Sequence, residues 1–325
     1  MPGKSSKTDE QFFEESLSLF IDEGKRLQKI MPEVVDEYND HSLLKLIAIT
    51  YWVGIFVPIA HKQLKERFGY QVVYVDTMAG SGVTKTKRAS DFFCGSFPGA
   101  INAANKRAFS FDKVIGVEID RLKSEALDKR IKAITPAPII TIHSDDIRNV
   151  SKIIAKELES KAVSYIVIDP QGFQGMSWNV LEPLLKCKGD AMITWFEDDL
   201  WRVRGAALSA GKSAEGDAEL LTELLGKPDW RDATSAGALT EIFIDRVLKA
   251  TKKCAVRSIE IIDQKGSHYK MILFVGRCRN AVYLVDQWKS HMDRRLGSNR
   301  GLYISHLLDR KAGRAIDLTD FGLVE

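Results

Sequence analysis

The chain has 325 residues, of which 45% are hydrophobic and 28% are charged. This is the composition of an ordinary globular protein, and it excludes a disordered chain, a collagen-like chain and a disulfide-rich scaffold. The 47 basic and 44 acidic residues leave a net charge of +3, which permits an anionic partner without requiring one.

The four cysteines are scattered along the chain, at Cys94, Cys187, Cys254 and Cys278. They form no C-x-x-C pair, so no metal is expected, and free thiols in a reducing, cytoplasmic protein are favoured. The polar N-terminus lacks the pattern of a signal peptide. The longest apolar run, residues 46–60, is too short to span a bilayer and contains Pro58. It predicts a buried helix and no membrane partner.

Helical periodicity opens the chain, with apolar residues at three-, four- and seven-residue spacing between residues 13 and 31. A second helix is predicted after residues 39–42, which supply capping side chains. From Gln71 onward, short β-rich apolar runs alternate with helical segments. The predicted strands are 71–76, 113–119, 138–143, 163–169, 190–196, 256–262 and 269–276, and the predicted helices include 121–134, 149–160 and 178–186.

The alternation of apolar strands and helices predicts a parallel, doubly wound α/β sheet that is covered on both faces. Only six residues separate Ile262 from Tyr269, too few for a parallel crossover, so the last two strands must form an antiparallel hairpin. A Rossmann-like sheet of seven strands with an antiparallel last strand resembles the class I methyltransferase fold. The predicted organisation is an N-terminal helical segment (1–70), this α/β domain (71–280) with an insert at about 197–251, and a C-terminal helical extension (281–325).

Acidic and glycine residues follow the first predicted strand. Asp76 ends that strand, and Gly80, Ser81 and Gly82 come directly after it. Glycines in this place let the backbone turn sharply and approach a ligand closely, and in open α/β sheets ligands bind at the carboxyl ends of the strands. A carboxylate there can accept a hydrogen bond from a ligand ammonium group.

Three more strands end in acids. Glu118 ends the second strand, where a carboxylate can bind both hydroxyls of a ribose. Asp145 and Asp146 follow the third strand; one could bind an adenine amino group while the other caps the next helix. Asp169 ends the fourth strand. Because these ends share one edge of the sheet, the acids together predict a nucleoside-binding site.

Two basic segments of the sequence could contact an anionic ligand. The insert contains Arg202, Arg204 and Lys212 near Trp201, which could bind a phosphate backbone from a mobile lid or simply form a solvated loop. Residues 85–88 are basic as well, and a solvated loop is the favoured interpretation there.

The chain resembles the three-Cys-motif partner protein family (TcmP) over roughly residues 40–280. The matching runs are YVDTMAGSG (74–82), GSFPGA (95–100), VIGVEID (114–120), IDPQGFQGMSW (168–178) and YKMILFVG (269–276), with Lys45 and Tyr51-Trp52 in an N-terminal helix. It departs from the family at Thr77-Met78, at Ser81 and at Gln171. The family is named for a partner that carries the three cysteines, so a three-Cys-motif protein is an expected partner, besides nucleic acid.

The resemblance implies S-adenosylmethionine as the cofactor. Asp76, Gly80, Ser81 and Gly82 would hold its methionine end, Glu118 its ribose, and Asp145 or Asp146 its adenine. Asp169 would be the catalytic residue. The segment Pro170, Gln171, Gly172 and Phe173 would bind the acceptor, because amino-methylating enzymes of nucleic acids carry an (N/D/S)-P-P-(Y/F/W) motif at this place. Two functions follow: a methyltransferase with nucleic acid as the favoured acceptor, or a non-catalytic, methyltransferase-like scaffold for a partner.

Overall fold

The computed structural model describes residues 9–40, 42–86, 91–134, 139–173, 176–209, 214–226, 228–262, 268–276, 279–296, 304–305, 307–309 and 313. Its strands are β1 (Asp36–Tyr38), β2 (Gln71–Asp76), β3 (Val83–Thr86), β4 (Phe92–Cys94), β5 (Lys113–Val117), β6 (Ile139–His143), β7 (Ala162–Ile168), β8 (Gly189–Trp195), β9 (Lys253–Ile262) and β10 (His268–Gly276). Its α-helices are α1 (Asp9–Gln28), α2 (Ser42–Ala60), α3 (Glu66–Phe68), α4 (Ser96–Asn105), α5 (Arg121–Ile134), α6 (Ile147–Leu158), α7 (Trp178–Lys186), α8 (Glu197–Ala207), α9 (Ala214–Leu225), α10 (Ala236–Ala250) and α11 (Ala281–Leu296). A π-helical turn, η1 (His61–Lys65), joins α2 to α3, and a 3-10 turn, η3 (Pro228–Asp232), joins α9 to α10.

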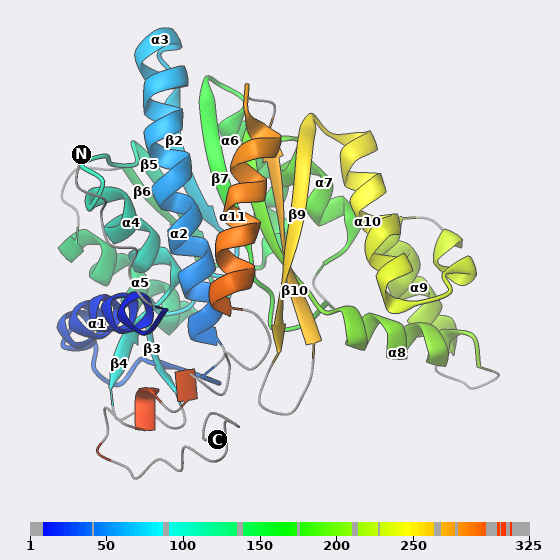
Figure 1. Ribbon diagram of the computed structural model, residues 1–325, viewed down its shortest axis with the longest axis horizontal. Helices are drawn as coiled ribbons and strands as arrows, with labels where there is room; N and C mark the ends of the chain where they lie inside the picture. The colour runs from blue at the N-terminus through cyan, green and yellow to red at the C-terminus, as the bar shows by residue number, and fades with distance from the viewer. Residues whose placement is uncertain are drawn as a thin grey trace.

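A seven-stranded sheet with the order β6-β5-β2-β7-β8-β10-β9 forms the centre of the molecule (Figure 1). β2 pairs in parallel with β5 and β7, and β10 is antiparallel to both of its neighbours, β8 and β9. Each of the seven predicted strands is present, shifted by no more than three residues at either end. This order, with an antiparallel strand inserted next to the edge, is the class I methyltransferase topology, so the predicted fold is confirmed.

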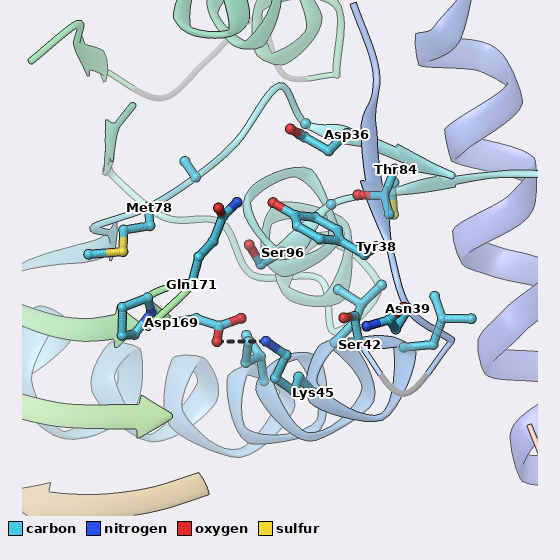
Figure 2. A pocket seen from close by; sticks show the side chains of 18 of the residues that line it. Asp36, Tyr38, Asn39, Ser42, Lys45, Met78, Thr84, Ser96, Asp169 and Gln171 are labelled. Carbon is cyan, nitrogen blue, oxygen red and sulfur yellow. Dashed lines mark hydrogen bonds and ion pairs between the residues drawn. The ribbon is translucent and has the colours of Figure 1, made fainter. Parts of the chain in front are cut away.

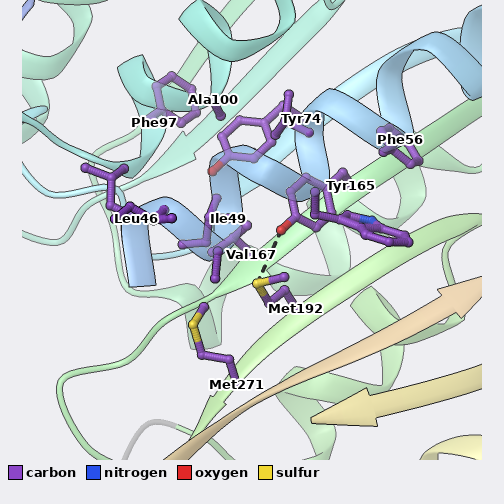
Figure 3. Close-up of a cluster of buried hydrophobic side chains, with 14 of the residues drawn as sticks. Leu46, Ile49, Phe56, Tyr74, Phe97, Ala100, Tyr165, Val167, Met192 and Met271 are labelled. Carbon is purple, nitrogen blue, oxygen red and sulfur yellow. Dashed lines mark hydrogen bonds between the residues drawn. The ribbon is translucent and has the colours of Figure 1, made fainter. Parts of the chain in front are cut away.

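Both faces of the sheet are covered, as the near-continuous apolar strands predicted. Along β2, Val72 and Tyr74 face one hydrophobic cluster while Val73 and Val75 face the other. The first cluster also contains residues of α1, α2, α4, α5 and α11, and the second contains residues of α6, α7, α9 and α10. Figure 3 shows Tyr74 in the first cluster, among side chains of α2, α4 and β7.

The N-terminal part of the chain also forms a small second sheet with the order β1-β3-β4. β1 pairs in parallel with β3, and β3 is antiparallel to β4. The solvated loop favoured for residues 85–88 was therefore wrong for residues 85 and 86, which belong to β3, while residues 87 and 88 lie outside the described residues. These strands have no local sequence signal, because β1 is only three residues long and its partner β3 is distant in the chain.

The insert after β8 is helical, comprising α8, α9, η3 and α10. The expectation of a mobile or solvated loop there was wrong for Arg204, which donates hydrogen bonds to the carbonyl oxygens of Trp230 (2.9 Å) and Arg231 (2.6 Å) and stacks on Trp201. Arg202 is paired with Asp199. Lys212 lies outside the described residues.

The apolar run predicted as a buried helix is α2. Together with η1 and α3 it makes a continuous helix, Ser42–Phe68, that is long and apolar enough to cross a bilayer by length and composition alone. However, 61% of its most apolar window is buried inside the protein, as in the core helix of a globular domain.

Candidate functional site

The acids predicted at the strand ends come to one edge of the sheet. β6, β5, β2 and β7 are consecutive parallel neighbours, so their carboxyl ends lie side by side. A cavity of about 330 Å³ opens at this edge. It is lined by residues of β1, α2, the glycine loop after β2, the start of α4 and the segment after β7, among them Asp36, Tyr38, Lys45, Met78, Ser96, Asp169 and Gln171 (Figure 2).

Asp76 lies beneath the cavity and is fully buried. Its carboxylate accepts hydrogen bonds from the Ser96 hydroxyl (2.6 Å), the Tyr74 hydroxyl (3.2 Å) and the Met78 backbone N–H (3.2 Å). Burial raises the pKa of Asp76 to about 6, against the lowering effect of these hydrogen bonds. Ser96 and Met78 line the cavity. The buried carboxylate of Asp76 therefore lies directly behind the cavity wall and makes the electrostatic potential there more negative.

The glycine loop turns as predicted. Gly80 has φ +62° and Gly82 has φ +82°, a conformation that residues with a Cβ rarely adopt. There is also no room for a side chain, since a Cβ on Gly80 would lie 2.6 Å from Asp36 Oδ2 and one on Gly82 would lie 2.9 Å from Leu127. Both glycines are therefore required by backbone conformation and by close packing.

Ser81, predicted as a cofactor contact, is fully buried and bonded on every side by the protein. Its N–H donates to Asp36 Oδ2 (2.6 Å), its hydroxyl donates to the Val83 carbonyl (2.9 Å), and its carbonyl accepts from Arg130 Nη1 (2.8 Å). The polar groups of Ser81 thus hold the loop in place and do not face the cavity.

β1 contributes residues that sequence reasoning missed. Asp36 is buried and pairs with Lys123 (2.8 Å) besides accepting the Ser81 N–H. Two positions on, Tyr38 lines the cavity together with Gln171 (Figure 2). Burial and the charges of Asp36 and Asp169 raise the pKa of Tyr38 well above its ordinary value, so it is a neutral hydrogen-bonding group on the cavity wall.

Asp169 is the one predicted strand-end acid that lines the cavity. Its Oδ1 lies 2.8 Å from Lys45 Nζ, and the two side chains are 21% and 16% exposed. Lys45 comes from α2, 124 positions earlier in the chain, and also lies 5.8 Å from the centre of the Tyr269 ring. The sequence resemblance named Lys45, but only the packing of α2 against the carboxyl end of β7 brings the two residues together.

The segment after β7 lies partly on the cavity wall and partly against the hydrophobic core. Pro170 and Gln171 line the cavity with Asp169, whereas Gly172 has open space around it. Phe173, predicted to stack on an acceptor base, packs against the second hydrophobic cluster and does not line the cavity. The aromatic residues on the cavity wall are Tyr38 of β1 and Phe196, which follows β8 and lies 6.4 Å, centre to centre, from Tyr269.

The remaining predicted acids lie outside the cavity lining. Glu118 is half-buried, accepts a hydrogen bond from the Asp120 N–H (2.9 Å), and has its pKa raised by burial. Asp146 is the N-cap of α6 and accepts from the Arg148 N–H (2.8 Å). Asp145 accepts from the Asn149 side chain (2.9 Å). Of the two alternatives left open for this pair, the capping role belongs to Asp146.

No protein-family model and no curated protein sequence matches the chain. Solved structures that align with it include protein LPL1258 from Legionella pneumophila, at 12% identity and a TM-score of 0.47 over 80% of this chain and 93% of that one. Trm1 from Pyrococcus horikoshii with S-adenosyl-L-methionine aligns at 13% identity and a TM-score of 0.39, over 74% and 56% of the two chains. The O-methyltransferase TomG from Streptomyces achromogenes, in complex with S-adenosylmethionine, aligns at 12% identity and a TM-score of 0.38, over 80% of this chain and 99% of that one. The fold assignment rests on the strand order, and membership of the TcmP family stays a prediction.

Proposed function

We propose that this protein is an S-adenosylmethionine-dependent methyltransferase. The proposal rests on three features that lie together at one edge of the central sheet. The tightly held glycine loop after β2, the acid after β5 and the Asp169–Lys45 pair meet at the carboxyl edge, where ligands of open α/β sheets bind.

The cofactor would lie across the ends of β2 and β5. Gly80 and Gly82 allow close approach of the backbone. The Glu118 carboxylate, which also interacts with the Asp120 and Gly80 N–H groups, would accept hydrogen bonds from the two ribose hydroxyls. Ile119 follows Glu118 and is 67% exposed, which offers an apolar surface for the adenine ring beside Asp145. The methionine end would point toward the cavity above Asp76, whose negative charge favours an ammonium group.

The acceptor proposed is an exocyclic amino group of a nucleic-acid base. Asp169 can accept one N–H hydrogen bond from it while Lys45 fixes the carboxylate. Phe196 offers a ring on which a planar base can stack. Bound S-adenosylmethionine would supply the methyl group: the amino nitrogen would bond to the methyl carbon as the bond from that carbon to sulfur breaks, S-adenosylhomocysteine would be released, and the proton lost by the nitrogen would pass to the Asp169 carboxylate. Such a transfer depends mainly on alignment of the two reactants.

The test is in two steps. Titration calorimetry should show binding of S-adenosylmethionine and no binding of NAD, and a labelled-methyl assay with total nucleic acid and with total protein should label the nucleic acid. Cofactor binding without transfer to either extract would support the second candidate, a methyltransferase-like scaffold. Failure to bind the cofactor would refute the proposed function.

Removing single acids should weaken cofactor binding. Asp76→Ala and Glu118→Ala should each weaken the binding of S-adenosylmethionine by about 1–3 kcal/mol. Asp76→Ala removes a buried negative charge beside the ammonium group, and Glu118→Ala removes a charged hydrogen-bond acceptor for the ribose. Asp146→Ala is the matched control: loss of an N-cap should cost about 1 kcal/mol of stability and leave the affinity unchanged. Calorimetry and thermal unfolding measure both quantities. Equal affinities in all three folded variants would contradict the assignment.

Cofactor affinity should also depend on pH. The pKa of Asp76 is about 6, so its carboxyl is ionised at pH 8 and largely protonated at pH 5. If the ionised form attracts the ammonium group, affinity should fall as the pH drops through 6 and be about tenfold weaker at pH 5. Calorimetry between pH 5 and pH 8 measures this profile. Asp76→Asn should flatten it, and an unchanged profile in that variant would assign the titration to another group.

A further inference from the structure

A second cavity lies at the opposite end of the sheet, between α2 and α11. We call it the α2–α11 cavity. It has a volume of about 780 Å³ and is bounded by the beginnings of β7 and β8 and the end of β10. In Figure 1, α2 and α11 run next to each other over the sheet, and α3 lies at the top of the view. Its walls are largely apolar and include Trp52, Ile55, Phe56, Ile59, Leu64 and Leu284.

The α2 helix is more apolar than its burial accounts for. A helix that is apolar all round is normally buried on all sides, yet Ile55 and Ile59 are only half-buried where they face this cavity. Phe68 (60% exposed) and Tyr283 (63% exposed) are large hydrophobic side chains on the two helical segments that flank it. The helix also widens into the π turn η1 at this point, a distortion found frequently at functional sites.

The mouth of the cavity is positively charged. Arg67, Lys188 and Arg279 come from three different segments, all line the cavity and all are exposed. None of the three forms an ion pair with a carboxylate in the part of the chain that the structure describes. Lys188 instead lies over the Tyr70 ring, 3.7 Å from its centre. Three uncompensated cations around an apolar opening complement a ligand with an anionic group.

The inner wall fixes the orientation of such a ligand. Asp190 lines the cavity but is buried, and its carboxylate accepts hydrogen bonds from the Gly276 N–H (2.9 Å) and the Trp52 indole N–H (3.1 Å). A second anion beside it would be repelled. Lys253 offsets part of the charge of Asp190 at the inner wall, whereas three basic side chains lie at the mouth, so the mouth is the favoured place for the anionic group, with the apolar part extending inward along α2.

We propose that the α2–α11 cavity binds an anionic amphiphile, a single apolar chain that carries a carboxylate or phosphate head group. The volume lies within the range of small-molecule sites, about 300–1,000 Å³. The concave shape, open on one side, suits one chain of a free ligand better than a bilayer surface. The proposal is independent of the methyltransferase function, because none of the residues that carry it lies at the cavity containing Asp169.

The test uses dodecanoate and dodecyl phosphate below their micelle concentrations, with dodecyltrimethylammonium as the cationic comparison. Titration calorimetry should show saturable 1:1 binding of both anions and no binding of the cation. Across octanoate, decanoate and dodecanoate, each added methylene should tighten binding about fourfold, the increment expected for burial of one CH₂ group. Absence of saturable binding of the anions, or equal affinity for the cation, would overturn the proposal.

Three variants localise the site. Ile59→Glu puts a charge on the apolar wall and should abolish binding. Arg67→Glu replaces an exposed side chain at the mouth, so it should fold normally and bind about tenfold more weakly. The control is Lys152→Glu, the same charge reversal at an exposed position of α6, and it should bind like the original protein. Equal binding by Arg67→Glu and Lys152→Glu would refute the location.

Two further measurements exclude other occupants. Binding to phosphatidylglycerol vesicles without binding of monomeric dodecanoate would overturn the proposal in favour of a membrane surface. Light scattering should show the same oligomeric state for the original protein and for Ile59→Glu. A dimer that Ile59→Glu dissociates would show that a second copy of the chain fills the cavity.

Discussion

Replacement of Asp169 by alanine should reduce methyl transfer about 100- to 1,000-fold while leaving S-adenosylmethionine affinity nearly unchanged. Asp169 is the strand-end acid that lines the cavity, and Lys45 fixes its carboxylate at 2.8 Å. An acceptor amino group aligned by that carboxylate loses the alignment chiefly in the transition state, so turnover falls more than ground-state binding. A labelled-methyl assay and calorimetry on the same preparations separate the two quantities.

Three comparison variants make the result specific. Asp146→Ala removes an acid from the same edge that caps α6 and does not line the cavity, and it should keep most of the activity. Asp169→Asn keeps the shape and one acceptor oxygen and should be less impaired than Asp169→Ala. Lys45→Met should reduce turnover less than Asp169→Ala, since Lys45 acts through Asp169. Near-equal transfer by the original protein and Asp169→Ala would exclude the proposed role and leave Asp169 a purely structural residue.

Replacement of Arg130 by alanine should lower the free energy of unfolding by about 3–5 kcal/mol, because it strips several buried acceptors of their donor. Arg130 is fully buried on α5. Its Nη1 donates to the Ser81 carbonyl (2.8 Å). Two more of its nitrogens donate to carbonyl oxygens in the stretch from the end of α1 to β1. Nε donates to Leu27 (3.3 Å) and Ile30 (3.1 Å), and Nη2 donates to Met31 (2.9 Å) and Val34 (2.7 Å). One side chain therefore fastens that segment to the glycine loop.

Urea unfolding measures this loss. Arg130→Lys keeps the charge but offers a single nitrogen, so it should be destabilised by an intermediate amount. Arg121→Ala, an exposed arginine on the same helix, should change stability by no more than about 0.5 kcal/mol. A loss below about 1 kcal/mol in Arg130→Ala would mean that water or a backbone shift satisfies the carbonyls instead.

The main sheet could be predicted from the sequence because its signals are local. Apolar runs such as residues 71–76 and 163–169 indicate strands covered on both faces, and β2 and β7 fall on them within a residue. The short connection after Ile262 required an antiparallel hairpin, which β9 and β10 form. Since the carboxyl ends of neighbouring parallel strands share one edge, the common location of Asp76 and Asp169 followed from the same pattern.

The composition of the cavity wall could not be predicted, because it depends on contacts between residues distant in the sequence. Asp36 meets Ser81 across 45 positions, and Lys45 meets Asp169 across 124. Which aromatic rings line the cavity was decided in the same way: Phe173 is nearer to Asp169 in the chain, but it packs against the core, and Tyr38 and Phe196 lie on the cavity wall. Hydrophobic periodicity determines which segments become strands and helices. The direction of an individual side chain after a strand is set by packing of the layers above and below it, and that is fixed only in the folded chain.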